Sequence, residues 1–262
     1  MKDFLREVAL AAGQLTLEYR TRLGELEVSH KSRRDMVSEA DIAVEKYIVG
    51  RINAEFPEHA VLGEEGGEVG SGKFRWIIDP IDGTTSFLRG QPFYSVSIAL
   101  EKDGQVILGA VNAPVLGELF TAEKGAGAFL NCKPISVTKE DQLEACLLAT
   151  GFACMRYEEE HNNMPYFAKI MPLITGIRRC GSAAIDMCYT ACGRVDGFWE
   201  LNLNIYDLAA GILIAEEAGA QVSDFTGKPV SDYKEIVCTN GLVHDELIGI
   251  ISTVKNENKY KD

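Results

Sequence analysis

Hydrophobic positions repeat with a helical period twice in the first quarter of the chain. Residues 3–20 and residues 38–57 each carry apolar side chains three and four positions apart, which predicts two amphipathic helices. Ser38 or Asp41 is placed to cap the start of the second helix, and Pro57 ends it. The chain therefore begins with helices that need an apolar face to pack against.

The pattern then changes to that of strands. Residues 60–79 predict a strand, a glycine-rich loop and a second strand, and residues 94–114 contain two apolar runs joined by Asp103-Gly104. An Asp-Gly pair between such runs indicates a β-hairpin. Residues 117–137 continue with strand-like sequence. The first half of the chain is therefore expected to combine helices with a largely antiparallel sheet.

From about residue 141 the elements alternate. Short apolar strands at 145–152 and 196–203 are interspersed with helices at 182–193 and 207–219. Alternation of this kind is typical of an α/β unit. We therefore predict a helical and antiparallel part at 1–140 and an α/β part at 141–262.

Composition and charge restrict the possible functions. The chain has 262 residues, of which 46% are hydrophobic and 25% charged, as expected for one large globular domain or two parts that share an interface. Its formal net charge of −13 disfavours nucleic acid as a partner, because phosphate backbones are bound by Lys and Arg. A small phosphate remains possible if metal ions reverse the local field.

Other features point to the cytoplasm. The sequence has no apolar run of about 18 residues, so no membrane span is expected. The first ten residues, MKDFLREVAL, carry acids and lack the apolar core of a signal peptide. Seven cysteines without a CxxC pair are expected to be reduced and mostly buried.

The segment WIIDPIDGTTSF, residues 76–87, carries the first candidate chemistry. A single acidic residue in a turn is commonly only solvated, but Asp79 and Asp82 follow an apolar run that predicts a buried strand. The ends of such strands face the ligand crevice in open α/β folds, and Pro80 stiffens the turn. Gly83 opens a predicted helix start, where free N–H groups would hold a phosphate oxygen.

Two further acids stand at element boundaries. Glu64 ends an apolar run, and Asp207 begins an apolar helix. Alone, Glu64 is explained as a solvated loop residue and Asp207 as a helix cap. A divalent cation such as Mg²⁺ takes about six oxygen ligands, so Asp79 and Asp82 would need such additional carboxylates. Together, these residues predict a metal site beside a phosphate.

Several other phosphate chemistries are excluded because the motifs that they require are absent. The sequence lacks GxxxxGK[ST], the DxDx[TV] motif of phosphatases with an aspartyl nucleophile, and GxSxG. Its four histidines are scattered without a motif around them. The remaining chemistry is attack by a metal-activated water without a covalent enzyme intermediate.

Four segments in the same order resemble the inositol monophosphatase family. These are GEE at 63–65, WIIDPIDGTTSF at 76–87, GSAAIDM at 181–187 and WELNLNIYDLAAGILIAEEAG at 199–219. The likeness spans nearly the whole chain, and the DPIDGTT block is highly specific. It implies a five-layered αβαβα sandwich, mixed α/β, of the inositol monophosphatase and fructose-1,6-bisphosphatase type. It also implies Mg²⁺ dependence with two or three ions, sensitivity to Li⁺, and a homodimer.

The same resemblance implies a set of metal ligands. Glu64, Asp79 and the Ile81 carbonyl would hold one ion, and Asp79, Asp82 and Asp207 a second, with a third and weaker ion near Glu64. Residues 1–140 would then carry most of the ligands, and the active site would lie between the two parts of the chain.

The resemblance also assigns roles around the substrate. Gly83 and Thr84 would donate N–H groups to the phosphate, while Thr84 and Asp41 would orient and deprotonate the attacking water. Glu200 would accept a substrate hydroxyl, and Ala183 would line that pocket. The candidate set is therefore catalytic Asp41, Glu64 and Thr84; metal-binding Glu64, Asp79, Ile81, Asp82 and Asp207; and substrate-binding Gly83, Thr84, Ala183, Glu200 and Asp207.

The function implied is hydrolysis of a small polyol or sugar phosphate, most simply myo-inositol 1-phosphate. Histidinol phosphate and fructose 1,6-bisphosphate are alternatives, and Arg178 and Arg179 could bind a second phosphate or be surface residues. Thr85 argues against the adenosine-phosphate branch, which usually has lysine there. A hypothesis of another class is a largely non-catalytic regulator that binds a partner such as RNA polymerase.

Overall fold

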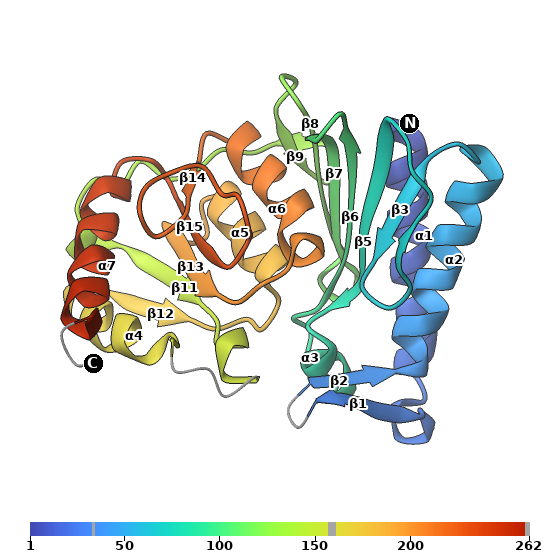
Figure 1. Ribbon diagram of the computed structural model, residues 1–262, viewed down its shortest axis with the longest axis horizontal. Helices are drawn as coiled ribbons and strands as arrows, with labels where there is room; N and C mark the ends of the chain where they lie inside the picture. The colour runs from blue at the N-terminus through green and yellow to red at the C-terminus, as the bar shows by residue number, and fades with distance from the viewer. Residues whose placement is uncertain (33–34, 157–160, 260–262) are drawn as a thin grey trace.

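The computed structural model describes residues 1–32, 35–156 and 161–259 of the chain. Within these residues, helices and sheets alternate in five layers, αβαβα, as Figure 1 shows from α2 across to α7. The layered sandwich expected from the sequence is therefore confirmed. The described residues form a sheet of eight strands, here called the large sheet, a sheet of five strands, called the small sheet, and a two-stranded hairpin.

The large sheet is built from the first half of the chain. Its neighbouring strands run antiparallel, except that β3 and β5 run parallel. In spatial order its strands are β10 (Lys133–Pro134), β9 (Ala128–Leu130), β8 (Glu118–Glu123), β7 (Gln105–Ala113), β6 (Ser95–Lys102), β5 (Phe74–Asp82), β3 (Ala60–Gly63) and β4 (Gly67–Val69).

The predicted β6–β7 hairpin is confirmed. Its turn residues Asp103 and Gly104 both have positive φ, +52° and +80°, as a type I′ turn requires. Glycine adopts this conformation without steric cost, and aspartate tolerates it better than most residues. The local sequence therefore fixes the reversal between the two long central strands.

Two helices cover the outer face of the large sheet. They are α1 (Lys2–Arg20) and α2 (Glu39–Glu55), which match the two helices predicted from periodicity. Their apolar stripes pack on the sheet through a core that includes Ile48, Trp76 and Ile98. Burial of these side chains supplies most of the driving force for the layer.

The middle layer consists of α5 (Ala183–Ala191) and α6 (Ile205–Glu217). Both helices are strongly apolar because they are covered on two sides. The core around them joins Phe120 of the large sheet to Phe198 of the small sheet. The two halves of the chain therefore share one apolar core, and their division into parts near residue 140 stays a prediction.

The small sheet contains parallel and antiparallel pairs. Strand β11 runs parallel to β12 and β13, whereas β15 runs antiparallel to β13 and β14. Its outer face is covered by α4 (Met164–Ile170) and α7 (His244–Lys259). In spatial order the strands are β12 (Gly176–Arg178), β11 (Leu147–Thr150), β13 (Gly197–Leu201), β15 (Glu235–Thr239) and β14 (Gln221–Ser223).

The remaining elements are short. The strands β1 (Val28–Ser32) and β2 (Asp35–Ser38) form the hairpin, and β2 packs near α3 (Thr84–Leu88) at the end of β5. The 3₁₀ turns are η1 (Leu23–Glu25), η2 (Pro114–Leu116), η3 (Leu143–Ala145), η4 (Ala153–Arg156) and η5 (Met171–Leu173).

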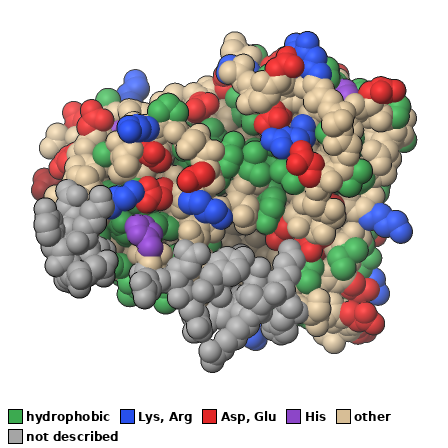
Figure 2. Space-filling view, viewed as in Figure 1, with side chains coloured by type: hydrophobic (Ala, Val, Ile, Leu, Met, Phe, Trp, Pro, Cys, Tyr) green, Lys and Arg blue, Asp and Glu red, His purple; other side chains and the backbone are tan. Residues whose placement is uncertain are grey.

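Among the described residues, every helix is too short or too polar to cross a bilayer. On the face shown in Figure 2, acidic and basic side chains are interspersed rather than gathered by sign. The expectation that nucleic acid is not a partner stays a prediction.

Candidate metal centre and active site

Three aspartates from distant parts of the sequence converge. Asp79 and Asp82 lie at the C-terminal end of β5, and Asp207 lies in the first turn of α6. One carboxylate oxygen from each lies within 4.8 Å of the others. Asp79 and Asp82 are almost fully buried, and Asp207 is half-buried. The predicted convergence of these three side chains is therefore present in the fold.

An irregularity in β5 explains why two aspartates three positions apart point the same way. In a regular strand they would face opposite sides of the sheet. The pairing of β5 with β6 shifts between Asp79, opposite Ser97, and Asp82, opposite Ser95. This one-residue bulge contains Pro80, which has no N–H to donate to the ladder. Both carboxylates consequently face the same pocket.

The electrostatics of the cluster favour a cation. Burial, followed by the charges of Glu64, Asp82 and Asp207, raises the pKa of Asp79 well above its ordinary value. Like charges brought together in a buried site repel one another unless they bind protons or a cation. The donors are carboxylate and carbonyl oxygens, the ligands that Mg²⁺ and other hard cations prefer. The residues present therefore fit a divalent metal.

Asp82 is held in place by the second half of the chain. Its Oδ2 accepts hydrogen bonds from Ser182 Oγ at 2.5 Å and from the backbone N of Ala184 at 2.8 Å. Ser182 is the N-cap of α5 and also bonds the backbone N of Ile185. The start of α5 therefore fixes the orientation of Asp82. Sequence analysis missed Ser182, although serine before an apolar helix is a typical capping signal.

Asp41 and Thr84 form a second pair beside the cluster. The Thr84 hydroxyl lies 3.1 Å from Asp41 Oδ1 and 3.1 Å from the Ile81 carbonyl oxygen, so its single hydrogen has two possible acceptors. Asp41 is fully buried, and this burial raises its pKa to about 6, with a smaller contribution from the charge of Glu64. A carboxylate that titrates near neutrality is suited to accept a proton.

A small pocket gathers most of the predicted residues. One of its lining residues is Gly83, whose φ of +95° favours glycine. A Cβ at this position would lie 3.0 Å from the carbonyl oxygen of Gly181. The predicted helix start after this glycine is the five-residue helix α3. The lining residues are Met36, Glu64, Asp79, Ile81, Asp82, Gly83, Thr84, Thr85 and Asp207.

Three predicted residues lie outside that lining. Asp41 contacts it through Thr84, and Ala183 precedes the residue whose N–H binds Asp82. Glu200, on β13, is buried and accepts a hydrogen bond from the backbone N of Ala153 at 2.9 Å. The structure does not bring Glu200 into the pocket, and its proposed contact with a substrate hydroxyl stays a prediction.

Sequence analysis also missed Asp186, a carboxyl group near the site. It lies on α5, is 1% exposed, and its Oδ1 has no hydrogen-bond partner among the described residues. Burial raises its pKa well above the ordinary value, and the nearby charges of Glu200 and Asp82 act in the same direction. The available signal was an aspartate within the largely apolar segment AAIDMCYTA.

Comparison with known proteins identifies a family with this fold. The model of the inositol monophosphatase family matches residues 1–257. Nus factor SuhB of Xylella fastidiosa is 41% identical over 225 residues, covering 86% of this chain and 82% of that protein. Inositol-1-monophosphatase of Synechocystis sp. is 41% identical over 248 residues, covering 94% and 86%. The structure of inositol monophosphatase from Anabaena (Nostoc) sp. has a TM-score of 0.87 and 36% identity, covering 96% and 95%.

Fold, site and comparisons together define the class. The five-layered sandwich, the site of carboxylate and carbonyl oxygens and the family match together define a metal-dependent phosphatase. The chain belongs to the inositol monophosphatase family.

Proposed function

We propose that this phosphatase is a Mg²⁺-dependent phosphomonoesterase of small polyol or sugar phosphates, with myo-inositol 1-phosphate as its first candidate substrate. The observation that carries the proposal is the approach of Asp79, Asp82 and Asp207 to within 4.8 Å beside Thr84. The name of the Synechocystis relative, inositol-1-monophosphatase, supports the choice of substrate.

The residues that would hold the ions are those of the acidic pocket. Glu64, Asp79 and the Ile81 carbonyl would bind one ion, Asp82 and Asp207 would join Asp79 at a second, and a third would lie near Glu64. When bound, the ions supply positive charge that neutralises charge developing on the phosphoryl oxygens and lowers the pKa of the attacking water.

The chain's own groups would handle the proton and the phosphate. The Thr84 hydroxyl donates its hydrogen to Asp41 Oδ1 and keeps lone pairs with which to accept a hydrogen bond from water. In this scheme the proton that leaves the water ends on Asp41 Oδ1. The raised pKa of Asp41 favours this uptake. The N–H groups of Gly83 and Thr84 would hold the phosphate, and Ala183 and Glu200, outside the pocket lining, would contact the polyol.

A second candidate function has its own support. One relative at 41% identity is named Nus factor SuhB, which favours a partner-binding regulator built on the same fold. The intact acidic cluster argues that such a role would be added to catalysis rather than replace it.

Release of inorganic phosphate tests the two candidates. The purified chain is assayed with myo-inositol 1-phosphate, histidinol phosphate, fructose 1,6-bisphosphate and nucleotide phosphates, with and without Mg²⁺ and Li⁺. We expect release that requires Mg²⁺, is inhibited by Li⁺, and has its highest specificity constant for myo-inositol 1-phosphate. A folded protein that released phosphate from none of them would favour the regulator.

We also propose that the protein acts in the cytoplasm as a homodimer. All seven cysteines are free thiols, and six of them are buried or half-buried, as is usual for proteins of a reducing compartment. Sedimentation equilibrium gives the mass in solution and tests the dimer directly.

A further inference from the structure

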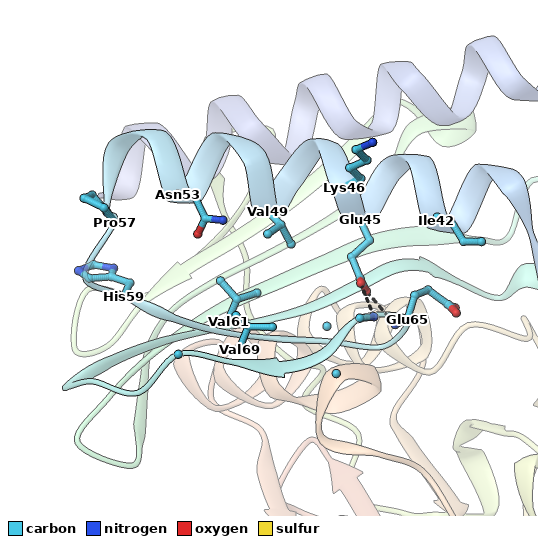
Figure 3. Close-up of a pocket in the computed structure, with 14 residues that line it drawn as sticks. Ile42, Glu45, Lys46, Val49, Asn53, Pro57, His59, Val61, Glu65 and Val69 are labelled. Atoms are coloured by element: carbon cyan, nitrogen blue, oxygen red, sulfur yellow. Dashed lines mark hydrogen bonds between the residues drawn. The ribbon is translucent and has the colours of Figure 1, made fainter.

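A carboxylate outside the predicted set lies buried against the turn between β3 and β4. Glu45 is on α2, one turn after Asp41, and is only 5% exposed. Its side chain points from the helix toward the turn between β3 and β4, whereas Lys46 points away (Figure 3). A buried carboxylate is unfavourable unless hydrogen bonds compensate for the lost water. The partners of Glu45 therefore indicate why it is there.

Those partners are two backbone amides that directly follow Glu64. Glu45 Oε2 accepts from the backbone N of Glu65 at 2.9 Å, and Oε1 accepts from the backbone N of Gly66 at 2.6 Å (dashed in Figure 3). Charge-assisted bonds of this kind are among the stronger hydrogen bonds in proteins. One side chain of α2 therefore holds the backbone of the turn that presents Glu64.

The glycines of the turn are explained by the same contact. A Cβ on Gly63 would lie 2.5 Å from Glu45 Oε2 and 2.7 Å from Oε1, and a Cβ on Gly66 would lie 2.9 Å from Oε1. The backbone thus packs on the carboxylate on both sides of Glu64 and Glu65. Only residues without a Cβ allow the backbone to come this close, so Gly63 and Gly66 shape the turn around the Glu45 carboxylate.

Glu64 is also held from the other side. Its backbone N donates to the carbonyl oxygen of Ile78 at 3.1 Å, next to Asp79 on β5. With β5 on one side and Glu45 on the other, the direction in which the Glu64 side chain leaves the backbone is set. The charge of Glu64 reaches Asp79, whose pKa it raises.

We propose that Glu45 is a positioning residue, which fixes the turn at residues 63–66 so that Glu64 faces the cation site. It acts through Glu64 and contacts neither substrate nor reacting atoms. The proposal rests on the proposed function, because it concerns binding of the ions.

A matched pair of substitutions tests this role. Glu45→Gln replaces one acceptor oxygen by an NH₂ group that faces a backbone N–H. Glu217→Gln does the same elsewhere, because Glu217 on α6 accepts from the backbone N of Gly125 at 2.7 Å and of Gly127 at 2.8 Å in the β8–β9 turn. Binding of Mn²⁺ is followed by EPR of the free ion, and Tm is measured without metal.

We expect the metal-free Tm of both variants to fall by similar amounts. Only Glu45→Gln should weaken Mn²⁺ binding, by about tenfold, as is typical for groups that orient metal ligands. Gly66→Ala is the second variant, for use if Glu45→Gln does not fold. It keeps the carboxylate but crowds Oε1, and it should also weaken Mn²⁺ binding.

The outcomes are distinguishable. If folded Glu45→Gln binds Mn²⁺ within about twofold of wild type, the role of Glu45 is overturned and the proposed function stays intact. If only Gly66→Ala folds, the same result for that variant has the same meaning. A wild-type protein that bound no Mn²⁺ would overturn the proposed function and the role of Glu45 with it.

Discussion

Asp41 and Asp207 occupy the same position in two helices, three residues after the N-cap. Asp41 Oδ2 accepts from the backbone N of Ser38 at 2.8 Å, and Asp207 Oδ2 accepts from the backbone N of Asn204 at 2.6 Å. Each is the acidic member of a capping box, a motif that stabilises the start of a helix. Capping is therefore compatible with a role in the site, because it orients Asp207 in the pocket lining and Asp41 against Thr84.

Asp41→Asn tests the proton acceptor. Asparagine keeps an oxygen for the Ser38 amide but cannot take up a proton at neutral pH, so we expect kcat to fall about 100-fold or more with little change in Tm. Ser38→Ala is the control: it removes the hydroxyl that donates to Asp41 Oδ2 at 2.5 Å and weakens the cap by about 1 kcal/mol, but it keeps the ionisable carboxyl group of Asp41. Equal loss of kcat in both variants would show that capping alone explains the effect.

Asp82→Asn tests the metal assignment. The amide oxygen can still accept from Ser182 and Ala184, so the fold should persist, while the lost negative charge should cut turnover by orders of magnitude. Phosphate release and circular dichroism measure the two effects. Near-normal turnover would mean that Asp82 does not bind an ion.

The raised pKa of Asp79 predicts how Mg²⁺ affects stability at different pH. The folded protein binds more protons than the unfolded chain between the ordinary and the raised pKa, so metal-free stability should fall as pH rises through this range. In the proposed function, Mg²⁺ binds the cluster in its ionised form. The increase in Tm caused by excess Mg²⁺ should therefore be larger at about pH 8 than at about pH 5. An equal increase at both would contradict this electrostatic account.

His244 predicts a pH dependence of the opposite sign. It is fully buried at the start of α7, and burial lowers its pKa. The Ser223 hydroxyl donates to the Asp224 carbonyl and so accepts from Nε2, while Thr239 lies 3.0 Å from Nδ1. The unfolded chain binds a proton more readily, so stability from His244 is present above about pH 6.5 and is lost as pH falls.

Comparison of wild type with His244→Gln isolates this contribution. Urea unfolding is measured across the acid range, and the wild-type curve should fall more steeply with decreasing pH than that of the variant. Parallel curves would show that other groups determine the acid sensitivity.

Local features of the fold were predictable from the sequence. Periodicity identified α1 and α2, and Asp103-Gly104 identified the β6–β7 hairpin, because both signals lie within a few neighbouring residues. The start of α6 was placed at Asp207, whereas the N-cap is Asn204. Both residues are good caps, and a boundary shift of one turn does not change the apolar pattern.

The site was predictable only in part. The motif around Asp79 and the family resemblance indicated which acids to combine, but the bulge that turns Asp79 and Asp82 to one side is a property of pairing with β6. Contacts such as Ser182 with Asp82, 100 positions apart, and Glu45 with the amide of Gly66 arise from packing between elements. A single sequence carries no local signal for such pairs.

The central claim is that Asp79, Asp82 and Asp207, with Glu64 beside them, hold divalent ions. Anomalous diffraction from crystals grown with Mn²⁺ tests it most directly, because Mn²⁺ takes the same oxygen ligands and is located without reference to activity. The account predicts a strong peak bounded by the carboxylates of Asp79, Asp82 and Asp207. Well-ordered crystals with no peak among these side chains, or with Mn²⁺ bound only elsewhere, would contradict it.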